Sequence, residues 1–203
     1  EAAERLSFAP NALARGLRLS TDERDHLFSL RPQAAHSTAA HSTAADETTS
    51  HERLAALVEA VRPNPAYVLD RLSNVIAANP EGLAMYRGFA ELPTAHRNTC
   101  RYLLTDPRAR DRFVEWEEIA RGAVAHLRSA NAGDLQRPAL RALTDDLRAG
   151  SVDFETWWTE HLVERRRGSV VHIRTDDGVV VARRYEVLYL PDDGLRMTLW
   201  FAA

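Results

Sequence analysis

The sequence contains no lysine, because all 26 of its basic residues are arginine. Several classes of enzyme depend on a lysine side chain. A phosphate-binding loop ends in Gly-Lys-Ser/Thr, a protein kinase uses a lysine on one of its strands, and a Schiff-base enzyme needs a primary amine. The absence of lysine therefore excludes these three classes.

Cysteine, long apolar runs and excess charge are also scarce. The single cysteine, Cys100, cannot form an internal disulfide, and no apolar run reaches the length of a membrane span. The first residues, EAAERLSFAPN, lack the apolar centre of a signal peptide, so the cytoplasm is the expected compartment. A formal net charge of -3 gives no overall attraction to nucleic acid or to an anionic membrane.

The chain does contain enough apolar residues for one domain of ordinary size, 45% of 203. Residues 7–31 predict two short helices, the second of which opens with a Ser20-x-x-Glu23 capping box. Residues 32–50 repeat the pentapeptide AHSTA and contain no large apolar side chain, which indicates a flexible linker. The main domain is therefore expected over residues 51–203.

This domain is predicted to begin with a helix over residues 51–61 and two short strands. A block of helices follows, in which Asp106-Pro107 has the form of a cap followed by a first-turn proline. The expected elements are strands Tyr67–Arg71 and Val75–Ala78, a helix over about Ala95–Leu104 capped by Thr94, one long helix from Pro107 that carries Phe113 and Trp116, and helices over about Pro138–Ala149 and, with Ser151 as cap, Asp153–Glu164.

The last 35 residues change to a period of two. SVVHIRT, VVVARRYEVLYL and LRMTLWFA are typical strands, and DDG and PDDG between them are hairpin signals. The economical packing is an α+β domain, in which a five-stranded antiparallel sheet places the first hairpin beside the last strand and helices cover one face. This is the layout of a PAS-like sensor domain.

Catalytic and metal-binding patterns are weak. The linker histidines, His36, His41 and His51, have no HExxH motif or cysteine at ligand spacing, and they read as solvated residues. Cys100 lies one helical turn after His96, but a lone helical cysteine is usually a buried apolar residue. We therefore predict no catalytic residue, no metal ligand and no cofactor.

Aromatic side chains are more informative. Phe113, Trp116, Phe154, Trp157 and Trp158 lie on helices that would face the sheet, and such a set can be a plain core or the wall of a ligand chamber. A chamber that also held arginine and amide groups would suit a molecule with an apolar tail and a carboxylate head. The polar residues expected near this chamber are Asn79, Arg97, Asn98 and His161.

Four segments together carry a resemblance to a known family. NPAYVLDRLSNVIAANPEGLAMY, HRNTCRYLLTDPRARDRFVEWEEIARGAVAHLR, VDFETWWTEHLV and RRYEVLYLPDDGLRMTLWFA resemble the ligand-binding domain of MmyB-like transcription regulators, over about Pro63 to Ala203. NALARGLRLSTDERDHLFSL, within residues 1–31, is similar to the last two helices of the Xre-type helix-turn-helix domain of this family. The recognition helix itself is not expected in this chain.

The resemblance implies a PAS-like fold, a pocket able to hold a fatty acid, DNA binding through the N-terminal domain, and a homodimer. It carries over Asn79, Arg97, Asn98, Trp116, Phe154, Trp157 and His161 as positions that match the family's motifs, with Arg97 or Asn98 near the ligand head group. Leu72 and Ala78 stand where the family has tryptophan, and His172 is displaced from its usual place before a glycine. These departures bear on the shape of the pocket and on ligand identity.

Three functions follow as hypotheses. The first is a cytoplasmic bacterial transcription regulator that senses a small hydrophobic or fatty-acid-like ligand. The second is a ligand-free dimerisation or partner-binding module of such a regulator, with the aromatic residues as core. The third, an enzyme that uses His96, His161 or His172 as a base, has no nucleophile motif to support it.

Overall fold

The computed structural model describes residues 44–161, 167–190 and 194–203. A helix, two strands, a block of helices and three final strands follow one another in the order that the sequence predicts. The elements are α3 (Ala44–Ala60), β1 (Ala66–Leu69), β2 (Val75–Ala78), α4 (Pro80–Ala84), η1 (Phe89–Glu91), η2 (Thr94–His96), α5 (Thr99–Thr105), α6 (Pro107–Arg112), α7 (Trp116–Ala130), α8 (Pro138–Gly150), α9 (Val152–Thr159), β3 (Ser169–Arg174), β4 (Val180–Tyr189) and β5 (Arg196–Ala202). The helices predicted within residues 7–31 lie outside the described residues.

The strands form one antiparallel sheet in the order β2-β1-β5-β4-β3. The first hairpin lies beside the last strand, with Tyr67 opposite Thr198 and Val68 opposite Met197. This arrangement confirms the expected α+β, PAS-like topology. It brings the start and the end of the domain together at the centre of the sheet.

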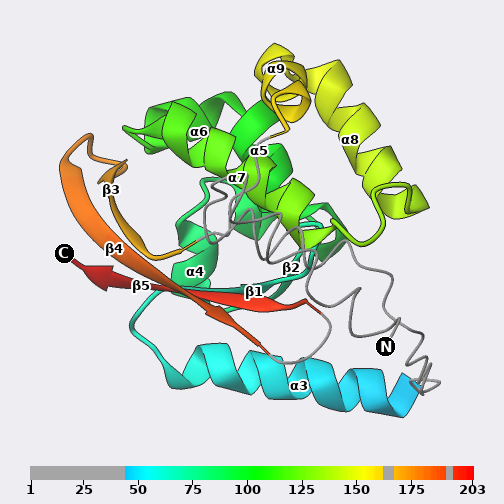
Figure 1. The fold of residues 1–203 in the computed structure, drawn as a ribbon. Coiled ribbons are helices and arrows are strands. Elements are labelled where there is room, and N and C mark those ends of the chain that lie inside the picture. The colour runs from blue at the N-terminus through cyan, green and yellow to red at the C-terminus, as the bar shows by residue number, and fades with distance from the viewer. Residues whose placement is uncertain (1–43, 162–166, 191–193) are drawn as a thin grey trace, which may run out of the picture.

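Helices cover both faces of the sheet, which corrects the expectation of one covered face. Figure 1 shows α3 along the outer face and the other helices on the opposite side. Leu54 and Val58 of α3 pack with Val68 and Met197 in a small core of their own. Met197 and the partly buried Leu199 of β5 therefore face α3. Trp200 of the same strand contributes to the larger core under the other helices.

The predicted long helix is broken between α6 and α7. Phe113 has an extended backbone, with φ of -104° and ψ of 117°, and forms an isolated β-bridge with Ile173. The backbone N–H of Val114 donates to the carbonyl of His172 at 3.0 Å. Contact with strand β3 therefore interrupts an apolar stripe that would otherwise continue through this point.

Helix boundaries follow the caps, with two exceptions. Asp106 and Ser151 cap α6 and α9 as predicted, but α5 is capped by Asn98, and Thr94 lies in the short η2 instead. Helix α3 starts at Ala44, inside the predicted linker.

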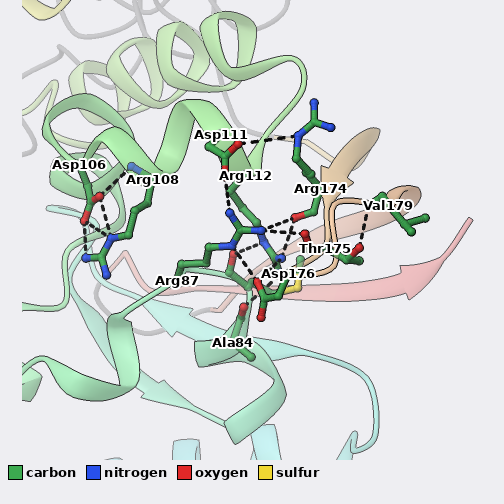
Figure 2. Close-up of polar contacts among 11 residues, drawn as sticks. Ala84, Arg87, Asp106, Arg108, Asp111, Arg112, Arg174, Thr175, Asp176 and Val179 are labelled. Carbon is green, nitrogen blue, oxygen red and sulfur yellow. Dashed lines mark hydrogen bonds and ion pairs between the residues drawn. The ribbon is translucent and has the colours of Figure 1, made fainter.

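A polar cluster joins the β3–β4 hairpin to the helices. The guanidinium of Arg112 donates to the carbonyls of Ala84, Met85 and Arg174, and Arg87 pairs with Asp111 and Asp176 (Figure 2). The side chain of Arg112 is 11% exposed, and burial, followed by the nearby Arg87, lowers its pKa. Arg112 therefore lies largely buried between α6, α4 and β3 and not on an exposed face of α6.

Within the described part of the chain, no helix combines the length and the apolar character that crossing a bilayer requires. The same residues contain no cluster of three or more histidine, cysteine or acidic side chains that could hold a metal ion.

Candidate ligand-binding site

The predicted aromatic residues separate into two groups. Phe113 lies in a cluster with Tyr86, Phe89 and Tyr102, which pack edge-to-face and stacked with ring centroids about 5 Å apart. The second group lies where α9 crosses α7, away from the sheet. There the rings of Trp116 and Trp157 are 5.9 Å apart, and Phe154 stacks on Trp158 at 5.4 Å.

Asn79 is completely buried between β1, α3 and α4. Its Oδ1 accepts from the backbone N–H groups of Ala66 and Gly82, at 3.0 and 2.7 Å. Its Nδ2 donates to the carbonyls of Val58 and Asn64, both at 2.9 Å. All four hydrogen-bonding positions of this amide are thus used inside the protein.

Asn98 caps the start of α5, and Arg97 directly precedes it. Arg97 donates to the carbonyls of Leu92 and Ala90 at 3.0 and 3.2 Å. Asn98 accepts from the backbone of Arg101 as the helix cap and donates to the carbonyl of Leu72 and to Asn74. Asn98 also borders a small cleft of about 190 Å³.

A larger cleft of about 420 Å³ opens between α7, α8 and the end of α9, which lie side by side in Figure 1. We call it the Arg128 cleft. Its lining includes Arg128, Leu135, Arg141, Thr144, Arg148 and Trp158. His161, predicted from the sequence as a site residue, lies at its rim with an exposed side chain.

Arg128 has an unusual environment. The residue is 8% exposed, its guanidinium carbon lies 4.1 Å from the centre of the Trp158 ring, and one Nη donates to the Trp158 carbonyl at 2.6 Å. No carboxylate of the described residues lies within ion-pair distance of it. Burial, and to a smaller extent the charge of Arg148, lowers the pKa of Arg128. A buried guanidinium without a counter-charge is costly unless an anionic ligand pairs with it or hydrogen bonds compensate for its lost hydration.

The sequence did not single out Arg128. Trp116, Ala120, Val124 and Arg128 follow one another at steps of four, so Arg128 continues the buried line of helix α7. A charged residue at a position reserved for apolar side chains was the available signal. Arg128 also lies in the last turn of the helix, where positive charge is favoured. The sequence therefore offered a second explanation for an arginine at this position.

A third cleft, of about 270 Å³, separates α7 from β3 and β4 and is lined by Ile119, Val171 and Tyr185. Glu115 and Glu118 lie at its edge. Glu115 accepts from the backbone N–H of His172 at 2.9 Å and bonds the His172 ring at 2.5 Å. This edge is acidic, whereas the Arg128 cleft is basic.

Glu115 predicts a pH dependence of stability. Partial burial raises its pKa, but hydrogen bonds from the backbone and ring of His172 outweigh this effect, and the pKa lies below the usual 4.5. Because the folded-state pKa is lowered, the stabilisation is present above the usual glutamate pKa and is lost as the pH falls through the folded-state value. Glu115→Gln should therefore lower the urea midpoint at neutral pH and reduce its decline in acid.

Glu117→Gln is the matched control, since Glu117 is exposed two residues further along. Urea midpoints of both variants and the parent protein at about pH 7 and about pH 3 provide the comparison. Equal pH slopes for Glu115→Gln and the parent would contradict the role given to the Glu115–His172 contact.

The antiparallel sheet of five strands, with helices on both faces (Figure 1), has the layout of a PAS-like domain. The family model of the MmyB-like transcription regulator ligand binding domain matches residues 50–203, and the chain belongs to this family. Among solved structures, the crystal structure of the PAS domain of an HTR-like protein from Haloarcula marismortui is similar at 15% identity and a TM-score of 0.33, covering 77% of this chain and 99% of that one. Comparison with curated proteins found no match.

Proposed function

We propose that the chain is the sensor part of a cytoplasmic, DNA-binding bacterial transcription regulator that responds to a small hydrophobic or fatty-acid-like ligand. The observation that carries this proposal is the family membership over residues 50–203, a ligand-binding domain of transcription regulators. The described fold supports it, because aromatic side chains and three clefts border the helices on one side of the sheet. We propose a regulatory role rather than an enzymatic one.

The residues proposed to contact the ligand are those predicted from the sequence. Among them, His161 borders the Arg128 cleft, and Phe154 stacks on Trp158, which lines that cleft. Trp157 of α9 packs on Trp116 of α7. Phe113 lies in the neighbouring aromatic cluster. Asn79, Arg97 and Asn98 remain proposed ligand residues, although each has hydrogen-bond partners within the protein.

Identification of a co-purifying molecule tests the ligand. The protein is purified from cells and denatured, and the released small molecules are identified by mass spectrometry. We expect an acyl species in an amount comparable with the protein. A protein that releases no organic molecule, and that also fails to take up fatty acids when they are supplied, would contradict the proposal.

Ligand binding can regulate transcription only if it favours one conformation or assembly over another. We propose a homodimer that binds DNA through its N-terminal helices, with the ligand shifting DNA affinity. The DNA affinity of the full-length regulator should therefore change when the released ligand is added back. An unchanged affinity would limit the ligand to a structural role.

One observation favours the alternative of a ligand-free dimerisation module. Val170, Val180 and Leu188 lie on the outer face of β3 and β4 and are 52%, 44% and 50% exposed. Exposed apolar side chains on one face of a sheet are typical of a protein interface. Sedimentation of the protein with and without fatty acid separates the two functions, because this module would form the same dimer in both conditions.

A further inference from the structure

We infer that the Arg128 cleft binds the carboxylate group of a small organic acid, with Arg128 as its principal contact. This inference rests on the proposed ligand-sensing function and specifies the chemistry of the ligand. It differs from the expectation for Arg97 and Asn98, which lie at the start of α5.

Trp158 holds the guanidinium of Arg128 in a fixed orientation. The carbonyl of Trp158 accepts one Nη–H at 2.6 Å, and the indole ring lies under the guanidinium at 4.1 Å. The indole is itself stacked on Phe154. A guanidinium that stacks on a ring keeps its in-plane N–H groups available at its edges, which is the geometry that a carboxylate needs for two parallel bonds.

The charge of the cleft is suited to a single negative group. Arg148 already bonds Glu155 and Asp145, at 2.7 and 3.2 Å. Arg141 adds a further positive charge at the lining, and Arg128 has no carboxylate partner among the described residues. Among the described residues, the three arginines and the two carboxylates bonded to Arg148 give a net charge of one positive unit. This charge matches a carboxylate more closely than a phosphate dianion.

The remaining lining accommodates the body of an acid. Leu135 and the edge of Trp158 supply apolar surface, while Thr144 and Gln136 are polar. The volume of about 420 Å³ lies within the range of small-molecule sites. Because burial disfavours the charged form of Arg128, a bound carboxylate would remove part of this cost, and the domain should be stabilised by the acid.

The test compares an acid with its neutral analogue. The protein, freed of small molecules, is titrated with hexanoate, hexanol and inorganic phosphate by calorimetry, and its thermal midpoint is measured with each. Arg128→Met removes the charge but keeps an unbranched side chain over Trp158. Arg137→Ala is the matched control, since Arg137 is exposed beside the cleft, does not line it, and carries the same charge.

We expect hexanoate to bind and to raise the thermal midpoint, with hexanol at least about ten-fold weaker. Arg128→Met should weaken hexanoate by about ten- to a hundred-fold, whereas Arg137→Ala should leave it unchanged. Arg141→Ala, at an exposed position of the lining, should weaken hexanoate by about two- to five-fold. This variant keeps the test valid if Arg128→Met does not fold.

Several results would overturn the inference. If Arg128→Met folds and binds hexanoate as tightly as the parent, the proposed site is excluded. If Arg128→Met does not fold, undiminished binding by Arg141→Ala excludes it instead. Absence of hexanoate binding to the parent would do the same, and tighter binding of phosphate than of hexanoate would exclude the carboxylate class. If hexanol binds as tightly as hexanoate and still binds to Arg128→Met, the carboxylate site is excluded. The proposed sensing of a hydrophobic ligand would not be contradicted by this result.

Discussion

Replacing Asn79 with alanine should destabilise the domain by about 4 kcal/mol, because three buried hydrogen bonds and one partly buried hydrogen bond, at about 1 kcal/mol each, are lost. The change leaves the N–H groups of Ala66 and Gly82 and the carbonyls of Val58 and Asn64 without this partner. It also removes the cap of α4. Urea unfolding monitored by circular dichroism measures the effect.

Two further variants show the origin of the loss. Asn79→Asp keeps the acceptor for Ala66 and Gly82 but cannot donate to either carbonyl, so its cost should also be large. Asn64→Ala removes a single half-buried bond to the carbonyl of Val61 and should cost about 1 kcal/mol. A similar, small loss for Asn79→Ala and Asn64→Ala would contradict the structural role of Asn79.

Gly82→Ala should destabilise the domain by about 3 kcal/mol, although alanine is the better helix former. A Cβ at this position would lie 2.2 Å from the carbonyl oxygen of Ala66 and 2.8 Å from its carbonyl carbon. Ala66 belongs to the buried strand β1 and pairs with β5, so its backbone cannot move away easily. The close approach of α4 to this strand therefore depends on glycine.

Gly122→Ala is the matched control for this substitution. Gly122 lies within α7, and a Cβ there would meet no atom within 4 Å outside the neighbouring turns of the helix. Alanine at this position should stabilise the protein by about 0.5–1 kcal/mol. Thermal midpoints of the two variants should therefore move in opposite directions, and a shared direction would contradict the contact between α4 and β1.

Local patterns made much of the fold predictable. The period of two and the DDG turn identified β3 and β4, and Asp106 and Ser151 identified two helix starts. The pairing of β1 with β5 was expected because one sheet forms most simply when the first hairpin pairs with the last strand. Apart from this pairing, each of these signals lies within a few residues of the element that it predicts.

Long-range contacts explain what the sequence did not show. The break at Phe113 depends on its bridge to Ile173, and the burial of Arg112 depends on carbonyls of α4, the residue after it and β3. Arg128 differs, since its place on α7 was visible but its stacking on Trp158 was not. Helical spacing shows on which side of a helix a residue lies. It does not show which side chain from another element packs against that residue.

The same limit applies to the candidate site. The aromatic residues of α7 and α9 were predicted to share one region, and Trp116, Trp157 and Phe154 lie together there. The resemblance to a family motif placed Arg97 or Asn98 near the head group, whereas the inference above assigns the carboxylate to Arg128. The ligand contacts of Arg97 and Asn98 stay a prediction.

The most direct test of a ligand-sensing domain is the thermal midpoint of protein freed of small molecules and titrated with fatty acids of increasing chain length. A ligand that binds only the folded state must raise this midpoint with concentration. We predict a midpoint that rises with concentration for at least one chain length. An unchanged midpoint for every acid, up to its solubility limit, would contradict the account and favour the ligand-free module.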